Sequence, residues 1–225
     1  TNPLGTPPSV VRAVEDAARD LCRYPDPGCR ELTAALSDRE GVALDSILCG
    51  CGAAELIYAY CGALGAVRAL MPAPTFLEYG AALEAFGGEA EPFFLKEAEG
   101  FALTEAFLTA LERTDRGAVF LCSPNNPTGR LIRPELLEEI CRICHRRGLR
   151  LFVDECFLEL SDGGREASLA GWLDAFPGLF LLRAFTKSYG MAGLRLGYCL
   201  SGDGGLLSAM SRRVQPWNVS IPAQR

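Results

Sequence analysis

The chain has 225 residues, of which 49% are hydrophobic and 22% are charged. This balance is that of an ordinary globular protein with enough apolar residues for one sizeable core, and it excludes a disordered chain. The net charge of −6 and the lack of a long basic run argue against nucleic acid or an anionic membrane surface as the main partner. We therefore expect a small-molecule ligand.

No apolar stretch reaches the roughly twenty residues that a membrane-spanning helix requires. The first residues, TNPLGTPPSV, lack the charged and apolar regions of a signal peptide. Both observations lead us to expect a cytoplasmic protein.

Apolar spacing in the first third of the chain predicts helices over residues 9–24, 29–40 and 53–64, the last after a short apolar run at 47–49. Short apolar runs bounded by Gly or Pro then alternate with helical patterns. The runs predict buried strands at 66–72, 89–95, 117–123, 149–155 and 179–185. Helices are predicted between most of them, at 75–88, 104–114 and 134–148.

Intervening helices of crossover length predict a parallel sheet that is covered on both faces. One strand is an exception, because only about eight residues separate the run at 179–185 from the run at 194–201. This connection is too short for a helical crossover, so the strand at 194–201 should run antiparallel. The expected fold is a three-layer α/β/α domain with a mostly parallel sheet of about seven strands.

The ten cysteines lie mostly within apolar runs, where a free thiol behaves as a small hydrophobic group. The sequence CRICH, with Cys141, Cys144 and His145, matches the pattern for c-type haem attachment. Apolar spacing around it instead predicts an amphipathic helix, and His145 is the only histidine available for axial ligation. A single histidine also argues against Ser-His-Asp catalysis and against multi-histidine metal sites. We predict no metal site.

Ligands bind such sheets beyond the carboxyl ends of the strands. The loops expected there are 49–55, 73–79, 123–129, 154–160 and 184–190. The last of them contains Lys187, and Lys96 is the only other lysine among 22 basic residues. An arginine would supply charge equally well, but only a primary amine can lose its proton and act as a nucleophile. Lys187 is therefore predicted to act through its amine.

The order of three motifs is more specific than any one of them. SPNNPTG at 123–129 is followed about thirty residues later by VDE and then by TKSYGMAGLRLGY at 186–198. This arrangement resembles the class I/II aminotransferase family of fold type I pyridoxal-phosphate enzymes, over essentially the whole chain. The resemblance implies an enzyme that uses pyridoxal 5′-phosphate.

The resemblance also implies roles for single residues. Lys187 would form a Schiff base with the cofactor and transfer protons, and Asp154 would keep the pyridine nitrogen protonated. Asn126 would donate a hydrogen bond to the 3-oxygen of the ring, from a cis Asn126–Pro127 bond, and Phe76 would stack on the ring.

By the same resemblance, the cofactor phosphate would meet helix-start amides, a hydroxyl and a guanidinium, in residues Gly52, Ala53, Ala54, Thr186 and Arg195. Tyr24 in RYPDPG matches a tyrosine that relatives contribute to the phosphate of the neighbouring subunit. A homodimer is therefore expected.

Three positions depart from the family pattern. Phe157 stands where many aminotransferases have a tyrosine, Ala184 where a hydroxyl residue often contacts the phosphate, and Cys51 where asparagine is common. Residues 1–25 are expected to form an N-terminal arm with the first helix, and residues 26–225 the cofactor-binding large domain. The small C-terminal domain of the family, with its carboxylate-binding arginine, is expected to be missing from this chain.

Three features, NPLGTPP, RYPDPGCREL and the phenylalanine in DECF, look most like threonine-phosphate decarboxylases of cobalamin synthesis. Histidinol-phosphate aminotransferases are the alternative, followed by other members of the family. The decarboxylases and the histidinol-phosphate aminotransferases both act on phosphorylated amino compounds. Whether the substrate loses carbon dioxide or a proton depends on which bond of its α-carbon is held perpendicular to the cofactor ring. A non-catalytic sensor domain that binds the cofactor is a remote alternative, because no DNA-binding motif precedes NPLG.

Overall fold

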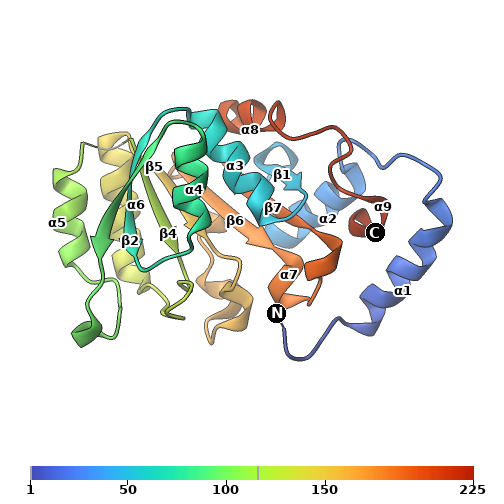
Figure 1. The fold of residues 1–225 in the computed structure, drawn as a ribbon, viewed down its shortest axis with the longest axis horizontal. Helices are drawn as coiled ribbons and strands as arrows, with labels where there is room; N and C mark the ends of the chain where they lie inside the picture. The colour runs from blue at the N-terminus through green and yellow to red at the C-terminus, as the bar shows by residue number, and fades with distance from the viewer. Residues whose placement is uncertain (1, 116) are drawn as a thin grey trace.

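The computed structural model describes residues 2–115 and 117–225. Its centre is a seven-stranded sheet with the strand order β1-β7-β6-β5-β4-β2-β3 (Figure 1). The strands are β1 (Ile47–Gly50), β2 (Arg68–Ala73), β3 (Glu89–Phe94), β4 (Ala118–Cys122), β5 (Arg150–Asp154), β6 (Leu179–Ala184) and β7 (Gly197–Ser201). The predicted number of strands is therefore confirmed.

Strand β7 is the one antiparallel member of the sheet. It lies between β1 and β6 and pairs antiparallel with both, while β2, β3, β4, β5 and β6 pair parallel with one another. The short connection between β6 and β7 contains only a four-residue helix, α7 (Phe185–Ser188), and a 3₁₀ turn at Ala192–Leu194. The antiparallel strand predicted at 194–201 is confirmed.

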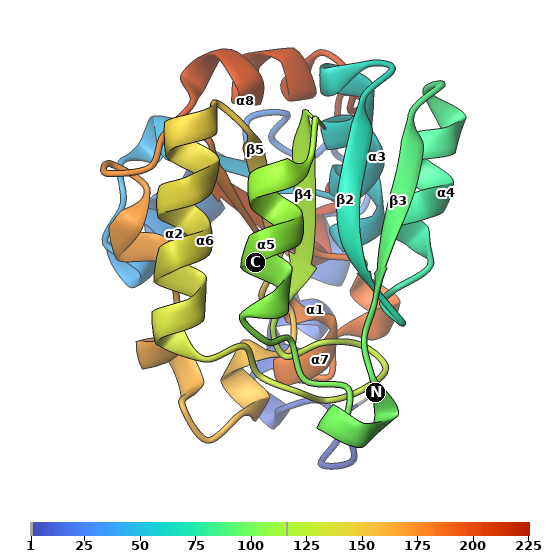
Figure 2. The same ribbon diagram turned by 90° about the vertical axis from the view of Figure 1, so that its left-hand side faces the viewer.

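Helices cover both faces of the sheet, as Figure 2 shows. One face packs against α2 (Arg30–Glu40), α5 (Ala106–Arg113) and α6 (Pro134–Arg147), and the other against α3 (Ala53–Leu64), α4 (Glu78–Ala85) and α8 (Gly204–Ser211). Alternate residues of each strand enter the two cores. On β4, for example, Val119 and Leu121 face α5 and α6, while Phe120 faces α3 and α4.

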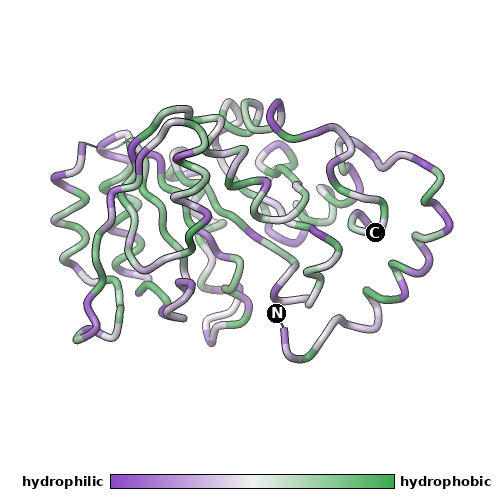
Figure 3. The backbone as a smooth tube through the Cα atoms, viewed as in Figure 1, coloured by the Kyte–Doolittle hydropathy of each residue, from purple (hydrophilic) through white to green (hydrophobic). Residues whose placement is uncertain are grey.

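Hydropathy along the chain follows these layers. In Figure 3 the central strands are mostly hydrophobic, and hydrophilic residues recur along the outer helices. Helix α6 contains CRICH with both Cys141 and Cys144 buried, so the prediction of an amphipathic helix there is confirmed. Within the described residues, no helix has the length and apolar character needed to cross a membrane.

The N-terminal segment stands apart from the sheet. Helix α1 (Pro8–Ala17) contacts the short C-terminal helix α9 (Ile221–Gln224), at the right of Figure 1. The prediction of a helix over 9–24 was too long, because α1 gives way to a 3₁₀ turn at Ala18–Asp20. Helical periodicity continues to Leu21, but this side chain is 67% exposed. Without a packing partner, the last predicted turns are not stabilised.

Strand β3 also differs from its prediction as a buried strand. It lies at the edge of the sheet and pairs only with β2. None of its residues is fully buried, and Phe94 is 73% exposed. The glutamates and Pro92 in this strand suit an edge, where charge and a missing N–H discourage pairing with another chain.

Candidate active site

The predicted site residues other than Tyr24 lie at one edge of the sheet. The loops after β1, β2, β4, β5 and β6 leave the carboxyl ends of parallel strands and therefore reach the same edge. Because β7 runs the other way, the residues just before it also lie there. The structure thus brings Arg195 to the edge that carries Lys187 and Asp154, although Arg195 does not directly follow a strand.

Lys187 lies in α7, directly after β6. Its Nζ lies 5.3 Å from the centre of the Phe157 ring, and its side chain is half-buried. Asp154 ends β5 (Arg150–Asp154), the parallel neighbour of β6, so the two residues share this edge of the sheet. Phe157 occupies a position where many family members have tyrosine, and here it supplies a flat apolar wall beside the amine instead of a hydroxyl.

Asp154, the last residue of β5, is buried and held by two donors. Its Oδ1 accepts a hydrogen bond from the Cys156 backbone N–H at 2.8 Å, and its Oδ2 accepts one from the Tyr79 hydroxyl at 2.7 Å. Burial raises the pKa of Asp154 above its usual range, and the two hydrogen bonds and the Lys187 charge oppose this rise. The carboxylate is therefore fixed in orientation and poised to meet a positively charged partner.

Tyr79 is a site residue that the sequence analysis missed. It is fully buried in α4, and burial raises the pKa of its hydroxyl well above the usual value, so it acts as a neutral donor to Asp154. Phe76, three residues earlier, contacts the Tyr79 ring edge-on at 5.5 Å between ring centres. Tyr79 therefore contacts both Phe76, the predicted stacking residue, and Asp154, the predicted carboxylate. The three-residue spacing of Phe76 and Tyr79 in PTFLEY could have indicated this role of Tyr79.

We expect Tyr79→Phe to lower the free energy of unfolding by about 1.5–3 kcal/mol, because it removes a donor from a buried carboxylate. Tyr60→Phe is a matched control. Tyr60 is fully buried against the same Phe120 and Phe152 rings, but its hydroxyl has no hydrogen-bond partner among the described residues. Denaturant unfolding should find Tyr60→Phe neutral or stabilising, and equal losses in both variants would contradict the assigned role of Tyr79.

The two asparagines of SPNNPTG have different surroundings. Asn125 is buried and fixes the loop, since its side chain bonds to Thr75, Pro74 and Thr128. The Asn126 side chain has no hydrogen-bond partner within the described residues, and it lines a pocket of about 290 Å³ together with Phe157. The Asn126–Pro127 bond is cis, as predicted. A free amide beside a pocket is available to bind a ligand.

The start of α3 forms a second part of the site. Gly52 precedes the helix with a φ of +83°, and an added Cβ there would lie 2.6 Å from an Arg195 guanidinium nitrogen. The backbone amides of Ala53 and Ala54 begin the helix without a side-chain cap. Since helix-start amides and a guanidinium both favour anions, this arrangement can hold a phosphate. Thr186, the residue directly before Lys187 in the sequence, is buried.

Glu55 stabilises this turn, and the sequence analysis did not identify it as a site residue. Its carboxylate accepts hydrogen bonds from the Cys51 backbone N–H at 2.7 Å and from the Asn218 side chain at 2.5 Å. The unusual Cys51 therefore contributes its backbone to the turn, and nothing in the structure explains its thiol. Asn218 lies far along the chain, so only the fold reveals this contact.

The N-terminal arm contacts the segment that carries Lys187. The Asn2 side chain donates to the Ser188 carbonyl at 3.0 Å, and the Thr6 hydroxyl donates to the Gly190 carbonyl at 2.8 Å. Gly190 has a φ of +60°, and a Cβ at this position would lie 2.5 Å from the Gly5 carbonyl oxygen. A side chain at Gly190 would therefore separate the arm from the site.

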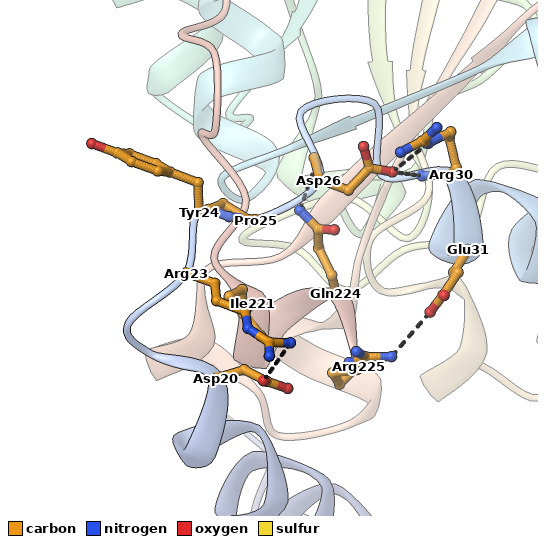
Figure 4. Close-up of a pocket in the computed structure, with 10 residues that line it drawn as sticks. All are labelled: Asp20, Arg23, Tyr24, Pro25, Asp26, Arg30, Glu31, Ile221, Gln224 and Arg225. Carbon is orange, nitrogen blue, oxygen red and sulfur yellow. Dashed lines mark hydrogen bonds and ion pairs between the residues drawn. The ribbon is translucent and has the colours of Figure 1, made fainter.

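Tyr24 does not join the other predicted residues within the chain. Its ring is 80% exposed and contacts Trp217 with 5.0 Å between ring centres. It borders a second pocket, shown in Figure 4, where its hydroxyl points away from the other residues drawn. The arginines of this pocket form ion pairs within it, in the pairs Arg23–Asp20, Arg30–Asp26 and Arg225–Glu31. The exposed hydroxyl is thus free to meet another molecule.

Comparison with known proteins agrees with this geometry. The family model described as aminotransferase class I and II matches residues 1–225. Threonine-phosphate decarboxylase from Salmonella typhimurium is 39% identical over 222 residues, covering 99% of this chain and 60% of that protein. Histidinol-phosphate aminotransferase from Desulfitobacterium hafniense is 37% identical over 232 residues, covering 100% of this chain and 62% of that protein.

Solved structures share the fold. The histidinol-phosphate aminotransferase from Clostridium acetobutylicum matches with a TM-score of 0.89 and 26% identity, covering 99% of this chain and 65% of that one. The L-threonine-O-3-phosphate decarboxylase from Porphyromonas gingivalis matches with a TM-score of 0.79 at 21% identity. The chain spans about 60% of the length of the curated relatives it matches. Its sequence, fold and site geometry together assign it to the class I and II aminotransferase family.

Proposed function

We propose that this chain forms the pyridoxal 5′-phosphate-binding large domain of an enzyme that acts on a phosphorylated amino acid or amino alcohol. One observation carries the proposal. Lys187 directly follows β6 and the buried Asp154 ends the neighbouring parallel strand β5, while Arg195 lies against the glycine that opens α3. An amine, an acid and an anion site are the groups that this cofactor requires.

The residues present fit the cofactor at each of its ends. When bound, it supplies an aldehyde that condenses with amines and a protonated ring that accepts electrons from the α-carbon of the substrate. Asp154 would hold the proton on the ring nitrogen, and Tyr79 keeps that carboxylate oriented. Asn126, whose side chain is free of partners within the described residues, would donate to the ring oxygen.

Lys187 would carry out the proton transfers. A primary amine next to Phe157 can leave the cofactor when substrate binds and then move protons at the α-carbon. The pocket beside Asn126 and Phe157 gives the substrate room, and none of the described residues that line it is charged. Cationic groups for the substrate phosphate and carboxylate would therefore come from a partner subunit or from further chain.

We favour L-threonine-O-3-phosphate decarboxylation, with histidinol-phosphate transamination as the alternative. Phe157 and the motifs NPLGTPP and RYPDPGCREL support the first, and the similar identities of 39% and 37% keep both open. The test is to incubate the whole protein with threonine phosphate, and separately with histidinol phosphate plus 2-oxoglutarate. Release of carbon dioxide supports the first reaction, and formation of glutamate supports the second. If the protein forms neither carbon dioxide nor glutamate, both reactions are contradicted.

Within this proposal, residues 1–25 act as an arm with the first helix, and residues 26–225 form the cofactor-binding domain. The active unit is a homodimer in which Tyr24 of one subunit binds the phosphate held by the other. The exposed Tyr24 hydroxyl and the exposed apolar side chains of Leu4, Val11 and Leu21 on the same arm support this arrangement. Ten free cysteines suit a reducing compartment, so we place the protein in the cytoplasm.

Tyr24→Phe should weaken cofactor binding by about ten- to a hundredfold, because a hydroxyl-to-phosphate hydrogen bond contributes about 1.5–3 kcal/mol. The fold should be unaffected, since the ring keeps its contact with Trp217. Mixing Tyr24→Phe subunits with Lys187→Ala subunits would test the shared site. Hybrid dimers contain one site with both residues, so activity should partly return. No recovery on subunit exchange, or an active monomer in sedimentation, would rule out the arrangement.

A further inference from the structure

The carboxyl ends of β5 and β6 carry ionisable groups on both faces of the sheet. Asp154 points toward α3 and α4, where it bonds to Tyr79. Side chains alternate along a strand, so Glu155 and Arg183 lie on the opposite face. The Glu155 backbone N–H still pairs with the Leu182 carbonyl at 2.9 Å, which keeps the two strands in register at this point.

Glu155 and Arg183 form a buried ion pair. Arg183 Nη2 lies 3.0 Å from Glu155 Oε2, and the side chains are only 4% and 2% exposed. Ser168 bridges them, since its hydroxyl oxygen accepts from Arg183 at 2.7 Å and the same hydroxyl donates to Glu155 at 3.1 Å. The second Glu155 oxygen accepts from the Leu169 backbone N–H at 3.0 Å. Both oxygens of this buried carboxylate are therefore bonded.

The pair belongs to a larger charge cluster behind α7. Glu40, at the end of α2, lies 3.6 Å from Arg183 and accepts a hydrogen bond from the Tyr198 hydroxyl at 2.9 Å. The outer members of the cluster, which form ion pairs with one another or with Glu40, are Arg39, Glu159 and Arg165. A small cavity of the cluster is lined by Arg183 and Glu155 together with residues of the Lys187 segment, Phe185, Ser188 and Tyr189. Arg39 of the cluster also lies over the Tyr189 ring, 5.6 Å from its centre, so the cluster contacts that segment.

Stability alone does not account for such a pair. Desolvation offsets most of the attraction between buried charges, and well-packed apolar residues often serve stability equally well. Charged groups with bonded partners do, however, fix the geometry of the backbone that carries them. Glu155 adjoins Asp154, and Arg183 precedes Lys187 by four residues, one at the end of each strand.

We propose that the Glu155–Arg183 ion pair is a positioning device that holds Lys187 at the correct distance from Asp154. The inference rests on the proposed function, because it concerns how Lys187 meets the cofactor aldehyde. Neither residue touches the cofactor. They act from the opposite face of the sheet by holding the ends of β5 and β6 together.

The test compares two ligands in the whole protein. Pyridoxal 5′-phosphate has an aldehyde that can condense with Lys187, whereas pyridoxine 5′-phosphate has an alcohol and cannot. The ratio of their dissociation constants measures how well Lys187 is placed. The variants are Arg183→Met, Glu155→Gln and the double variant, in which no partner is left buried with an unpaired charge.

In the double variant we expect the alcohol to bind as in the unaltered protein, because Asp154 and the start of α3 are intact. The preference for the aldehyde should fall by about ten- to a hundredfold, since a misplacement near 1 Å costs this much in a reacting group. Arg150→Met is the control. It breaks the Arg150–Asp203 ion pair at the other end of β5 and should leave the ratio unchanged.

An unchanged ratio in a folded double variant would overturn the inference while leaving the proposed function standing. Equal loss of affinity for both ligands would also overturn it, since the pair would then act only on general stability. An unaltered protein without preference for the aldehyde would instead contradict the proposed function of Lys187, and the inference would fall with it.

Discussion

Lys187→Arg is expected to reduce turnover of the whole protein by about 10⁴-fold or more, although it keeps a positive charge at the end of β6. A guanidinium does not lose its proton near neutral pH and cannot attack an aldehyde. The amine beside Phe157 is proposed both to hold the cofactor and to move protons at the substrate. Both roles depend on the amine and not on the charge.

Lys96→Arg is the matched control, because Lys96 is the only other lysine. Its side chain is 66% exposed and forms an ion pair with Glu99 at 3.2 Å, an interaction that arginine can also make. This variant should retain full activity. Borohydride reduction in the presence of pyridoxal 5′-phosphate, followed by peptide mapping, should place the label on Lys187 in both the unaltered protein and the Lys96 variant.

A label confined to Lys96 would contradict the proposed site, as would an active Lys187→Arg enzyme. Lys187→Ala gives a further measurement, because an added small primary amine can enter the space left by the side chain. Partial recovery of turnover with such an amine would separate the loss of chemistry from a loss of fold. Failure of Lys187→Ala to fold would be visible in its unfolding curve.

The sequence predicted those parts of the site that lie in loops directly after strands. Asn126, Asp154 and Lys187 each follow a short apolar run, and parallel topology then brings them to one edge. Arg195 was predicted from the family resemblance, and the antiparallel direction of β7 explains why it reaches the same edge. The positions of the loops follow from local patterns and connection lengths, whereas the roles of single residues came from the resemblance.

Contacts between distant segments could not be predicted in this way. The bond from Asn218 to Glu55 joins residues 163 positions apart, and the ion pair of Glu40 with Arg183 joins α2 to β6. Neither has a local pattern, because each depends on how the layers pack. The same limit explains the prediction of β3 as buried, since strand order decides which apolar run becomes an edge.

Asp154→Asn is expected to lower turnover by about 10²- to 10³-fold, because a neutral amide cannot stabilise a protonated ring nitrogen as a carboxylate does. The geometry should survive. The amide oxygen can still accept from the Cys156 N–H, and the amide nitrogen can donate to the Tyr79 oxygen. Pyridoxal 5′-phosphate should consequently raise the unfolding temperature of this variant less than that of the unaltered protein.

Without cofactor, the same substitution should increase stability at neutral pH. Burial raises the pKa of Asp154, so the folded chain binds this proton more tightly than the unfolded chain. The stability contributed by neutral Asp154 is present below the unfolded pKa of 3.8 and is lost as the pH rises through the folded value. An asparagine does not titrate, so the advantage of Asp154→Asn in free energy of unfolding should grow as the pH rises from 3.8 through the raised pKa of folded Asp154. Glu155 and Lys187 are present in both proteins and largely cancel in this difference. A difference that is flat with pH, or that falls as the pH rises, would show that the hydrogen bonds from Cys156 and Tyr79 outweigh burial.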